Sequence, residues 1–199
     1  LQICVVGTNI INTNLKSSGI SLQEKTYLMN ENNIKYLEGV IWGAMIGAFG
    51  GCYSIRKELY NPVPKNYYMD DFYITLMVIS QGYKTINELK AVCYEDVSNK
   101  LTEEFRRKIR ISIGNYQNLQ SFAHLLKKPW KGYAFAFWSH KVIRLFGPFF
   151  IMLILILTLI LIDKPIYYNL MILQIGLLII PFIDKKKKKI NIHIILLRF

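Results

Sequence analysis

Two adjacent carboxylates, Asp70 and Asp71, open an amphipathic stretch that reads Asp-Asp-Phe-Tyr-Ile-Thr-Leu. A carboxylate at the N-terminus of a helix stays ionised because the helix dipole favours its charge, and an ionised carboxylate can act as a general base. A glycine-rich segment precedes the pair and an arginine-rich segment follows it. This order suggests half of an active site, in which a carboxylate base faces a cationic pocket. The alternative is an aspartate that only caps the helix.

The arginine-rich segment is expected to be a helix that begins at Thr102, where an N-cap residue is followed by two glutamates. Four residues share one face of this helix by their spacing: Arg107, Arg110, Gly114 and Gln117. Arginine binds phosphate through paired hydrogen bonds, and a glycine lets a ligand approach the backbone, so this face could hold a pyrophosphate. The alternative is a solvated basic face. A second face can be buried, and it carries Phe105, Ile109, Ile113 and Tyr116.

The elements that must position these residues alternate between strand and helix, which predicts an α/β domain without an internal repeat. Strands are expected near 3–6, 52–55, 83–86 and 91–94. A helix is expected at about 24–42, with a rough apolar stripe of Tyr27, Leu28, Ile34, Leu37 and Ile41. The acidic pair begins a helix at about 71–80 whose Phe72, Leu76 and Ile79 can point into a core.

Composition divides the chain into a soluble-like part and a membrane-like part. The 199 residues are 52% hydrophobic and 19% charged, and most of the apolar excess follows Arg144. The net charge of +12 often indicates nucleic acid or an anionic membrane surface, but the basic residues gather in two places that need no nucleic acid. We expect domains at 1–140 and 141–199. The chain starts within a strand and ends in an apolar run, so we expect it to be a piece of a longer protein.

Two apolar runs, 145–162 and 166–183, approach the roughly 20 residues of a membrane-spanning helix. The turn between them contains Asp163, Lys164 and Pro165, which predicts a transmembrane helical hairpin; buried core helices are the alternative. Five lysines at 185–189 follow the second run, and Lys141 and Arg144 precede the first. The positive-inside rule therefore places both ends of the hairpin and the N-terminal domain in the cytoplasm. The lysine run could also bind anionic lipid.

Three smaller features leave alternatives open. The aromatic segment 130–138 suits a lipid headgroup interface, or else a platform on which a sugar ring stacks. Cys4, Cys52 and Cys93 lack paired spacing, which favours reduced thiols over a zinc site or a disulfide framework. His140 stands alone at the membrane boundary, where a structural role is more common than a catalytic one.

Five segments, taken in order, resemble the C-terminal half of the membrane-bound family 2 glycosyltransferases, which include the cellulose, hyaluronan and poly-N-acetylglucosamine synthases. They are Gly47-Ala-Phe-Gly-Gly-Cys-Tyr-Ser-Ile-Arg56, Asp70-Asp71-Phe72, Gly82-Tyr83-Lys84, Glu104-Phe-Arg-Arg107-Lys-Ile-Arg110 and Ser139-His-Lys141-Val-Ile-Arg144. The resemblance implies a GT-A fold that uses a nucleotide-activated sugar and a divalent metal to invert the anomeric centre.

The resemblance also assigns roles to single residues. The family's Thr-Glu-Asp motif falls on Met69-Asp70-Asp71, so Asp71 matches the general base and Asp70, which replaces a glutamate, would support it. Gly50 and Gly51 with Cys52 match the segment that lines the acceptor end of the site. The Gln-x-x-Arg-Trp motif falls on 107–111. Arg110 is retained and could hold phosphate, whereas Ile111 cannot stack as the family's tryptophan does.

The family's metal-holding Asp-x-Asp motif does not occur in this sequence. The Mg²⁺ or Mn²⁺ ion and the nucleotide are therefore expected to bind residues of the parent protein outside these 199, and this chain alone is expected to transfer no sugar. The expected partners are a nucleotide-sugar donor, a saccharide or lipid-linked acceptor and membrane lipids, with the bacterial cell membrane as the location. The alternative from a different class is a non-enzymatic, membrane-anchored assembly or adaptor protein whose basic domain faces lipid.

Overall fold

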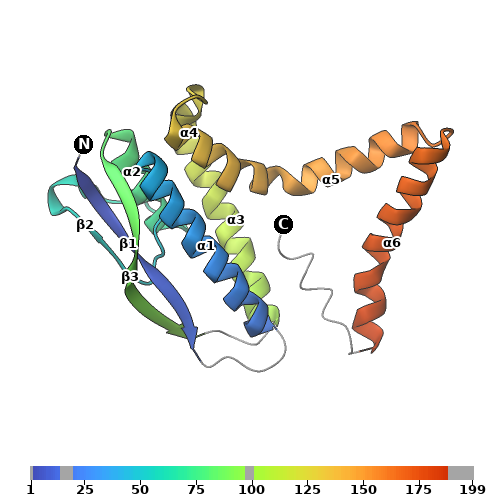
Figure 1. The fold of residues 1–199 in the computed structure, drawn as a ribbon, viewed down its shortest axis with the longest axis horizontal. Helices are drawn as coiled ribbons and strands as arrows, with labels where there is room; N and C mark the ends of the chain where they lie inside the picture. The colour runs from blue at the N-terminus through green and yellow to red at the C-terminus, as the bar shows by residue number, and fades with distance from the viewer. Residues whose placement is uncertain (1, 14–19, 97–100, 188–199) are drawn as a thin grey trace. The chain divides into compact units, whose positions relative to one another are not determined.

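The computed structural model describes residues 2–13, 20–96 and 101–187 (Figure 1). The chain separates into two compact units, 1–143 and 144–199, which are described one after the other. The first unit mixes helices with a small three-stranded sheet, which is compatible with the α/β class expected from the sequence.

The sheet has the strand order β2-β1-β3. The strand β1 (Ile3–Thr13) pairs in antiparallel fashion with β2 (Tyr53–Ile55) and in parallel with β3 (Lys84–Asp96). The prediction of two separate strands at 83–86 and 91–94 was wrong, because β3 is one strand with an irregularity. Thr8 of β1 pairs with Glu88 of β3, but the next residue of β1, Asn9, pairs with Val92, so the register between the two strands shifts at this point. A bulge of this kind looks like a loop in sequence.

Four helices belong to the described part of the first unit. They are α1 (Ile20–Trp42), α2 (Asp70–Ser80), α3 (Leu101–Ser121) and α4 (Gly132–Phe137). Of these, α1 and α2 pack against the sheet (Figure 1). The 3₁₀ turns η1 (Lys57–Leu59) and η2 (Ala123–Lys127) and a π-helical turn, η3 (Trp138–Val142), complete the unit. Phe72, Leu76 and Ile79 of α2 are buried in the core, which confirms the prediction for this helix.

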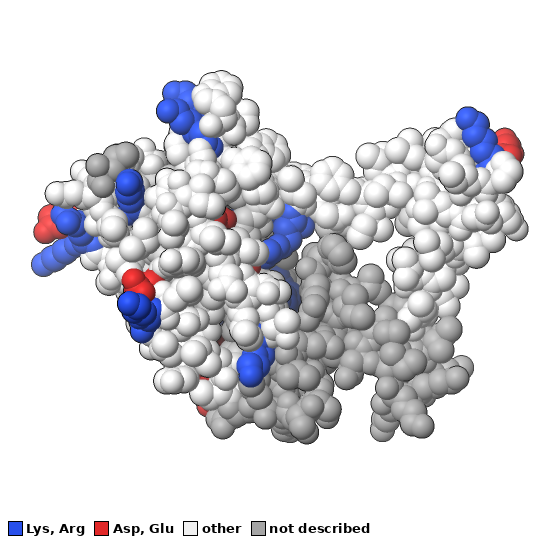
Figure 2. All heavy atoms as spheres, viewed as in Figure 1, with Lys and Arg blue, Asp and Glu red and all other residues white. Residues whose placement is uncertain are grey.

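The helix α1 is present as predicted, but its apolar stripe faces outward. Leu28 is buried, whereas Ile34, Leu37 and Ile41 are exposed, with 51% of Leu37 accessible to solvent. The side of α1 that faces the protein is instead polar: Glu24, Glu31, Asn32, Lys35 and Glu38 are all buried. Figure 2 accordingly shows few charged atoms over the middle of α1, although the chain is strongly basic.

The helix α3 differs from expectation in the same way. Phe105, Ile109, Ile113 and Tyr116, which were expected to be able to bury, are exposed by 42–55%. The opposite side of α3 contacts the segment that leads to the acidic pair. Gly114 lies against Met69, and the Asn118 side-chain amide donates to the Met69 carbonyl oxygen at 3.2 Å.

The second unit is a pair of apolar helices, α5 (Ile143–Ile160) and α6 (Pro165–Lys187). One continuous helical stretch among the described residues, Gly132–Ile160, is long and apolar enough to cross a membrane by length and composition. The described apolar part of α6, Pro165–Ile180, is shorter. The Gln174 amide donates to the Thr158 hydroxyl at 3.2 Å, which links the two helices near their turn. The lysine run 185–189 lies outside the residues whose side chains are described.

Candidate functional site

The acidic pair lies where the sequence predicts, at the first turn of α2, and the glycine turn lies beside it. Asp70 is exposed and Asp71 is half-buried. A Cβ built on Gly50 would stand 3.0 Å from Oδ2 of Asp71, so the missing side chain of this glycine leaves the carboxylate room. The other carboxylate oxygen, Oδ1, accepts the backbone N–H of Phe72 at 2.7 Å.

A chain of hydrogen bonds fixes the glycine turn against α2. The Thr75 hydroxyl donates to the Asp71 carbonyl oxygen at 2.7 Å and accepts the backbone N–H of Ala48 at 3.0 Å. On the other side of the turn, the Thr8 hydroxyl of β1 donates to the Cys52 carbonyl oxygen at 2.8 Å. The turn is therefore anchored to both α2 and the sheet, while Gly51 and Cys52 stay exposed.

The residues predicted on α3 separate into two groups. Gly114 and Gln117 contact the segment before Asp70, because Gln117 donates to the Asn66 carbonyl oxygen at 2.9 Å and accepts the Tyr68 backbone N–H at 3.1 Å. The close approach that Gly114 permits is thus occupied by the protein's own chain at Met69.

The two arginines have different surroundings. Arg107 forms ion pairs with Glu24 at 3.3 Å and with Glu104 at 3.5 Å. Arg110 is exposed on α3. The structure therefore brings Gly50 to Asp71, gives Arg107 carboxylate partners on α1 and α3, and leaves the Arg110 guanidinium accessible.

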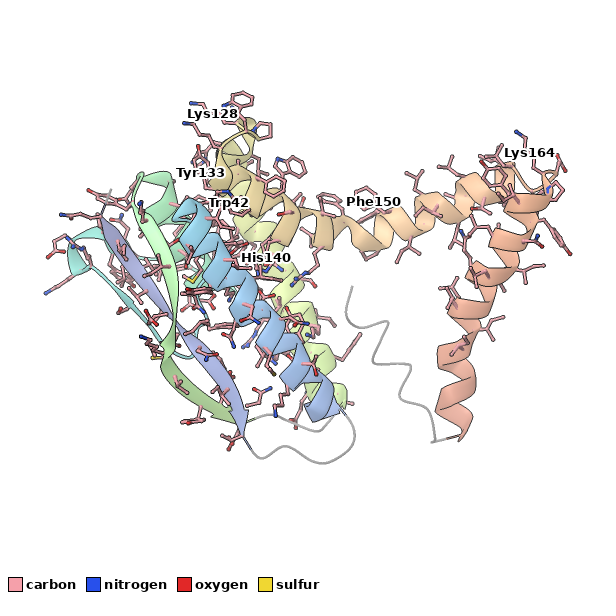
Figure 3. The ribbon with its side chains drawn as sticks, in the orientation of Figure 1. Trp42, Lys128, Tyr133, His140, Phe150 and Lys164 are labelled. Carbon is pink, nitrogen blue, oxygen red and sulfur yellow. The ribbon has the colours of Figure 1, made fainter. Side chains whose placement is uncertain are left out.

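Close to Asp71 lies a feature that sequence reasoning missed, a charged cluster in which buried Glu31, Lys35, Glu38 and His140 are joined by partly buried Lys141. The His140 ring lies between two carboxylates, with Nδ1 2.7 Å from Oε1 of Glu38 and Nε2 2.9 Å from Oε1 of Glu31. The Lys141 ammonium donates to the same Glu31 oxygen at 3.0 Å. Figure 3 shows His140 on the segment after α4, next to α1.

Local structure explains how the cluster assembles. Glu31, Lys35 and Glu38 are four and three residues apart, so they share one face of α1. The π-helical turn η3 holds more residues per turn than an α-helix, and its consecutive His140 and Lys141 both reach Glu31. The end of α1 is held to α4 by an edge-to-face contact between Trp42 and Phe135, with ring centroids 5.4 Å apart.

Both ring nitrogens of His140 face a carboxylate oxygen, whereas a neutral imidazole can donate from one nitrogen only. Glu38 also accepts the Ile46 backbone N–H at 2.9 Å, through its second oxygen. Burial raises the pKa of Glu31, but Lys141, His140 and Lys35 outweigh burial and hold that pKa far below its ordinary value.

Lys35 extends the cluster toward the acidic pair. Its side chain is buried, with 3% of the residue exposed, and its ammonium lies 3.2 Å from the centroid of the Phe49 ring. Burial lowers the pKa of Lys35 to about 7, although Glu31, Asp71 and Glu38 act in the opposite direction.

Burial also raises the pKa of Asp71, while the Phe72 N–H and the charge of Lys35 oppose this rise. Burial therefore acts on this carboxyl in the opposite sense to the helix dipole, which we expected to favour the ionised form.

The expectation of a structural His140 fits its position in the cluster, but the two glutamates that hold it were not identified from sequence. The sequence feature that could have identified the cluster is the helical spacing of Glu31, Lys35 and Glu38, combined with the adjacent basic residues His140 and Lys141. Within residues 2–13, 20–96 and 101–187, no group of three or more His, Cys, Asp and Glu side chains is arranged to hold a metal ion. No family model and no curated protein matches this chain.

Proposed function

We propose that this chain carries the acceptor half of an inverting, membrane-bound glycosyltransferase site, with Asp71 as the general base. The observation that carries the proposal is the position of Gly50 against the free oxygen of Asp71. A half-buried carboxylate with a raised pKa is a better proton acceptor than an exposed one, and the adjacent glycine leaves space for an acceptor hydroxyl.

In the proposed reaction, Oδ2 of Asp71 accepts the proton of an acceptor hydroxyl while the hydroxyl oxygen attacks the anomeric carbon of the donor sugar. A carbon–oxygen bond forms to the acceptor, and the bond to the donor's nucleoside diphosphate breaks with its electron pair. A single displacement of this kind inverts the anomeric centre. A bound Mg²⁺ or Mn²⁺ would neutralise the departing diphosphate, and residues outside these 199 would hold it.

The other residues predicted from the sequence have smaller roles in this proposal than Asp71. Exposed Asp70 adds negative charge next to the base, and Gly51 and Cys52 line the approach to it. Arg110 is better suited to a diphosphate than Arg107, because Glu24 and Glu104 already hold the Arg107 guanidinium.

The helices of the second unit would anchor the site to the membrane. The apolar stretch Gly132–Ile160 supports this proposal, and the basic residues at the ends of the helical pair support a cytoplasmic site on a bacterial cell membrane. The expected acceptor is a growing saccharide or a lipid-linked acceptor.

Asp71→Asn in the protein expressed from its natural gene tests the proposal. Isolated membranes are supplied with a panel of nucleotide sugars, and release of nucleoside diphosphate is measured. We expect turnover to fall by about 10²–10⁴-fold, the usual contribution of a general base. Asp163→Asn, in the turn between α5 and α6, is the matched control and should retain activity. Full turnover by Asp71→Asn would refute Asp71 as the general base, whereas wild-type membranes that release no nucleoside diphosphate from any nucleotide sugar would favour an assembly or adaptor protein.

A further inference from the structure

Lys35 adds a basic side chain to the charged region around Asp71. The carboxylates of Glu31, Glu38 and Asp71 lie in this region with the basic side chains of Lys35, His140 and Lys141, and Asp70 adds a further carboxylate beside Asp71. Glu31 and Glu38 form ion pairs with His140 and Lys141. Lys35 and Asp71 act on each other electrostatically: the charge of Lys35 favours ionised Asp71, and ionised Asp71 favours charged Lys35.

Geometry connects the same two residues through the glycine turn. The Lys35 ammonium lies on the Phe49 ring, and the next residue, Gly50, lies against Oδ2 of Asp71. Lys35 extends from α1 and Asp71 from the first turn of α2, with the turn between them. A cation is attracted to the negative face of an aromatic ring, so this contact fixes the position of the Lys35 ammonium next to the glycine turn.

We propose that Lys35 is a positioning residue for the base: its buried ammonium supplies the counter-charge that keeps Asp71 ionised, and its contact with Phe49 holds the glycine turn against the carboxylate. The inference rests on the proposed function, because an ionised Asp71 matters only if Asp71 accepts a proton.

The physical need for this counter-charge follows from burial. A carboxylate that is withdrawn from water tends to take up a proton, and a protonated Asp71 could not accept one from an acceptor hydroxyl. Other charges face the pair as well. Asp70, Tyr53 and Lys141 lie near Asp71, where Lys141 acts in the same sense as Lys35, and Glu31, Glu38 and Lys141 lie near Lys35. Asp70 opposes ionisation of Asp71, which increases the need for a neighbouring cation.

Titration of the carboxyl carbon tests the inference without an enzymatic assay. The full 199-residue chain is labelled with ¹³C at the aspartate side-chain carboxyl, placed in detergent micelles and titrated by NMR. Asp71→Asn identifies the Asp71 signal. We expect Lys35→Met to raise the midpoint of Asp71 by about one pH unit or more, the usual effect of losing a neighbouring opposite charge. Lys35→Arg should keep the midpoint near the wild-type value.

Lys108→Met is the matched control. Its ammonium also lies over an aromatic ring, 4.7 Å from the centroid of Tyr27, and pairs with Glu24 and Glu104. Its loss should leave the Asp71 midpoint unchanged. If Lys35→Met does not fold, Lys35→Gln provides the same comparison. An Asp71 midpoint that is equal in wild type and in the folded Lys35 variant would overturn the inference.

Activity distinguishes failure of this inference from failure of the proposed function. In the protein from the natural gene, Lys35→Met should move the acid limb of the pH profile of kcat/KM upward by the same amount as the NMR midpoint. Undiminished turnover by Asp71→Asn would refute the proposed function and with it the catalytic meaning of Lys35. A pH profile that Lys35→Met leaves unmoved, in an enzyme that needs Asp71, would refute the positioning role alone.

Discussion

Replacement of His140 with leucine should destabilise the first unit more than any surface change. The His140 ring is 2% exposed and its two nitrogens contact Glu31 and Glu38, whose side chains are each 4% exposed. Leucine fills a similar volume but donates no hydrogen bond, so two buried carboxylates lose a cationic partner. Lys141 still pairs with Glu31, and the Ile46 N–H still reaches Glu38, which limits the loss.

The expected size follows from buried ion pairs in general. Removal of one partner from such a pair costs about 3–5 kcal/mol, because the other charge remains buried without compensation. For a unit of this size, each kcal/mol lowers the thermal midpoint by roughly 3 °C, so His140→Leu should lower it by about 9–15 °C.

Intrinsic fluorescence provides the assay, because the tryptophans Trp42, Trp130 and Trp138 all belong to the first unit. The full chain is unfolded in detergent by heat and by urea, and the signal reports on that unit. His124→Ala is the matched control, since this histidine is exposed and its loss should change the free energy of unfolding by less than about 0.5 kcal/mol.

A second substitution checks the physical cause. Glu38→Gln in the His140→Leu background removes one of the stranded charges, so the double variant should recover about 1 kcal/mol or more relative to the sum of the two single changes. The free energy of unfolding of His140→Leu could instead lie within about 1 kcal/mol of the wild-type value, as expected for the His124→Ala control. In that case His140 does not stabilise the two buried carboxylates, and the reasoning about the cluster fails.

Three further outcomes follow from burial, space and charge. Leu76→Ala should cost about 2–5 kcal/mol in urea denaturation, and Leu37→Ala, on the exposed side of α1, less than about 0.5 kcal/mol; equal costs would contradict the orientation of α1. Gly50→Ala puts a Cβ 3.0 Å from Oδ2 of Asp71 and should reduce turnover without moving the thermal midpoint, as nucleoside diphosphate release and melting curves will check. The pKa of Lys35 falls from 10.5 to about 7 on folding, so between these values the unfolded chain binds more protons. The stability of wild type relative to Lys35→Met should therefore rise with pH across that window, by at most about 1.4 kcal/mol per pH unit in urea titrations, and stay level below it.

The parts of the site that could be predicted are those that depend on patterns within a short stretch of sequence. The helix after the acidic pair has an apolar period that matches its buried face, and Phe72 and Leu76 are in the core as expected. Gly50 stands close to Asp71 because a short, anchored turn precedes α2, and a glycine-rich turn is visible in sequence.

The orientation of α1 could not be predicted because helical spacing defines faces but does not say which one meets the protein. Leu37 and Ile41 look like core residues by type, and Glu31, Lys35 and Glu38 look like a solvated stripe. Burial of the polar stripe depends on cations from a segment about a hundred residues away in sequence, at His140 and Lys141. No local pattern contains that pairing. The bulged strand β3 was misread for a related reason, since its continuity is defined by its partner β1.

The burial of the charged cluster is itself an argument about function. Well-packed apolar residues often replace a buried ion pair at no cost in stability, so folding alone does not require charges at Glu31, Lys35, Glu38, His140 and Lys141. However, charged groups that are already fixed next to a reacting group stabilise the charge that develops in the transition state, because they do not have to reorient during the reaction. The cluster reaches Asp71 through Lys35 and the Phe49 ring. A polar interior at this place, with apolar side chains of α1 turned outward, is what the general base that we propose at Asp71 would require.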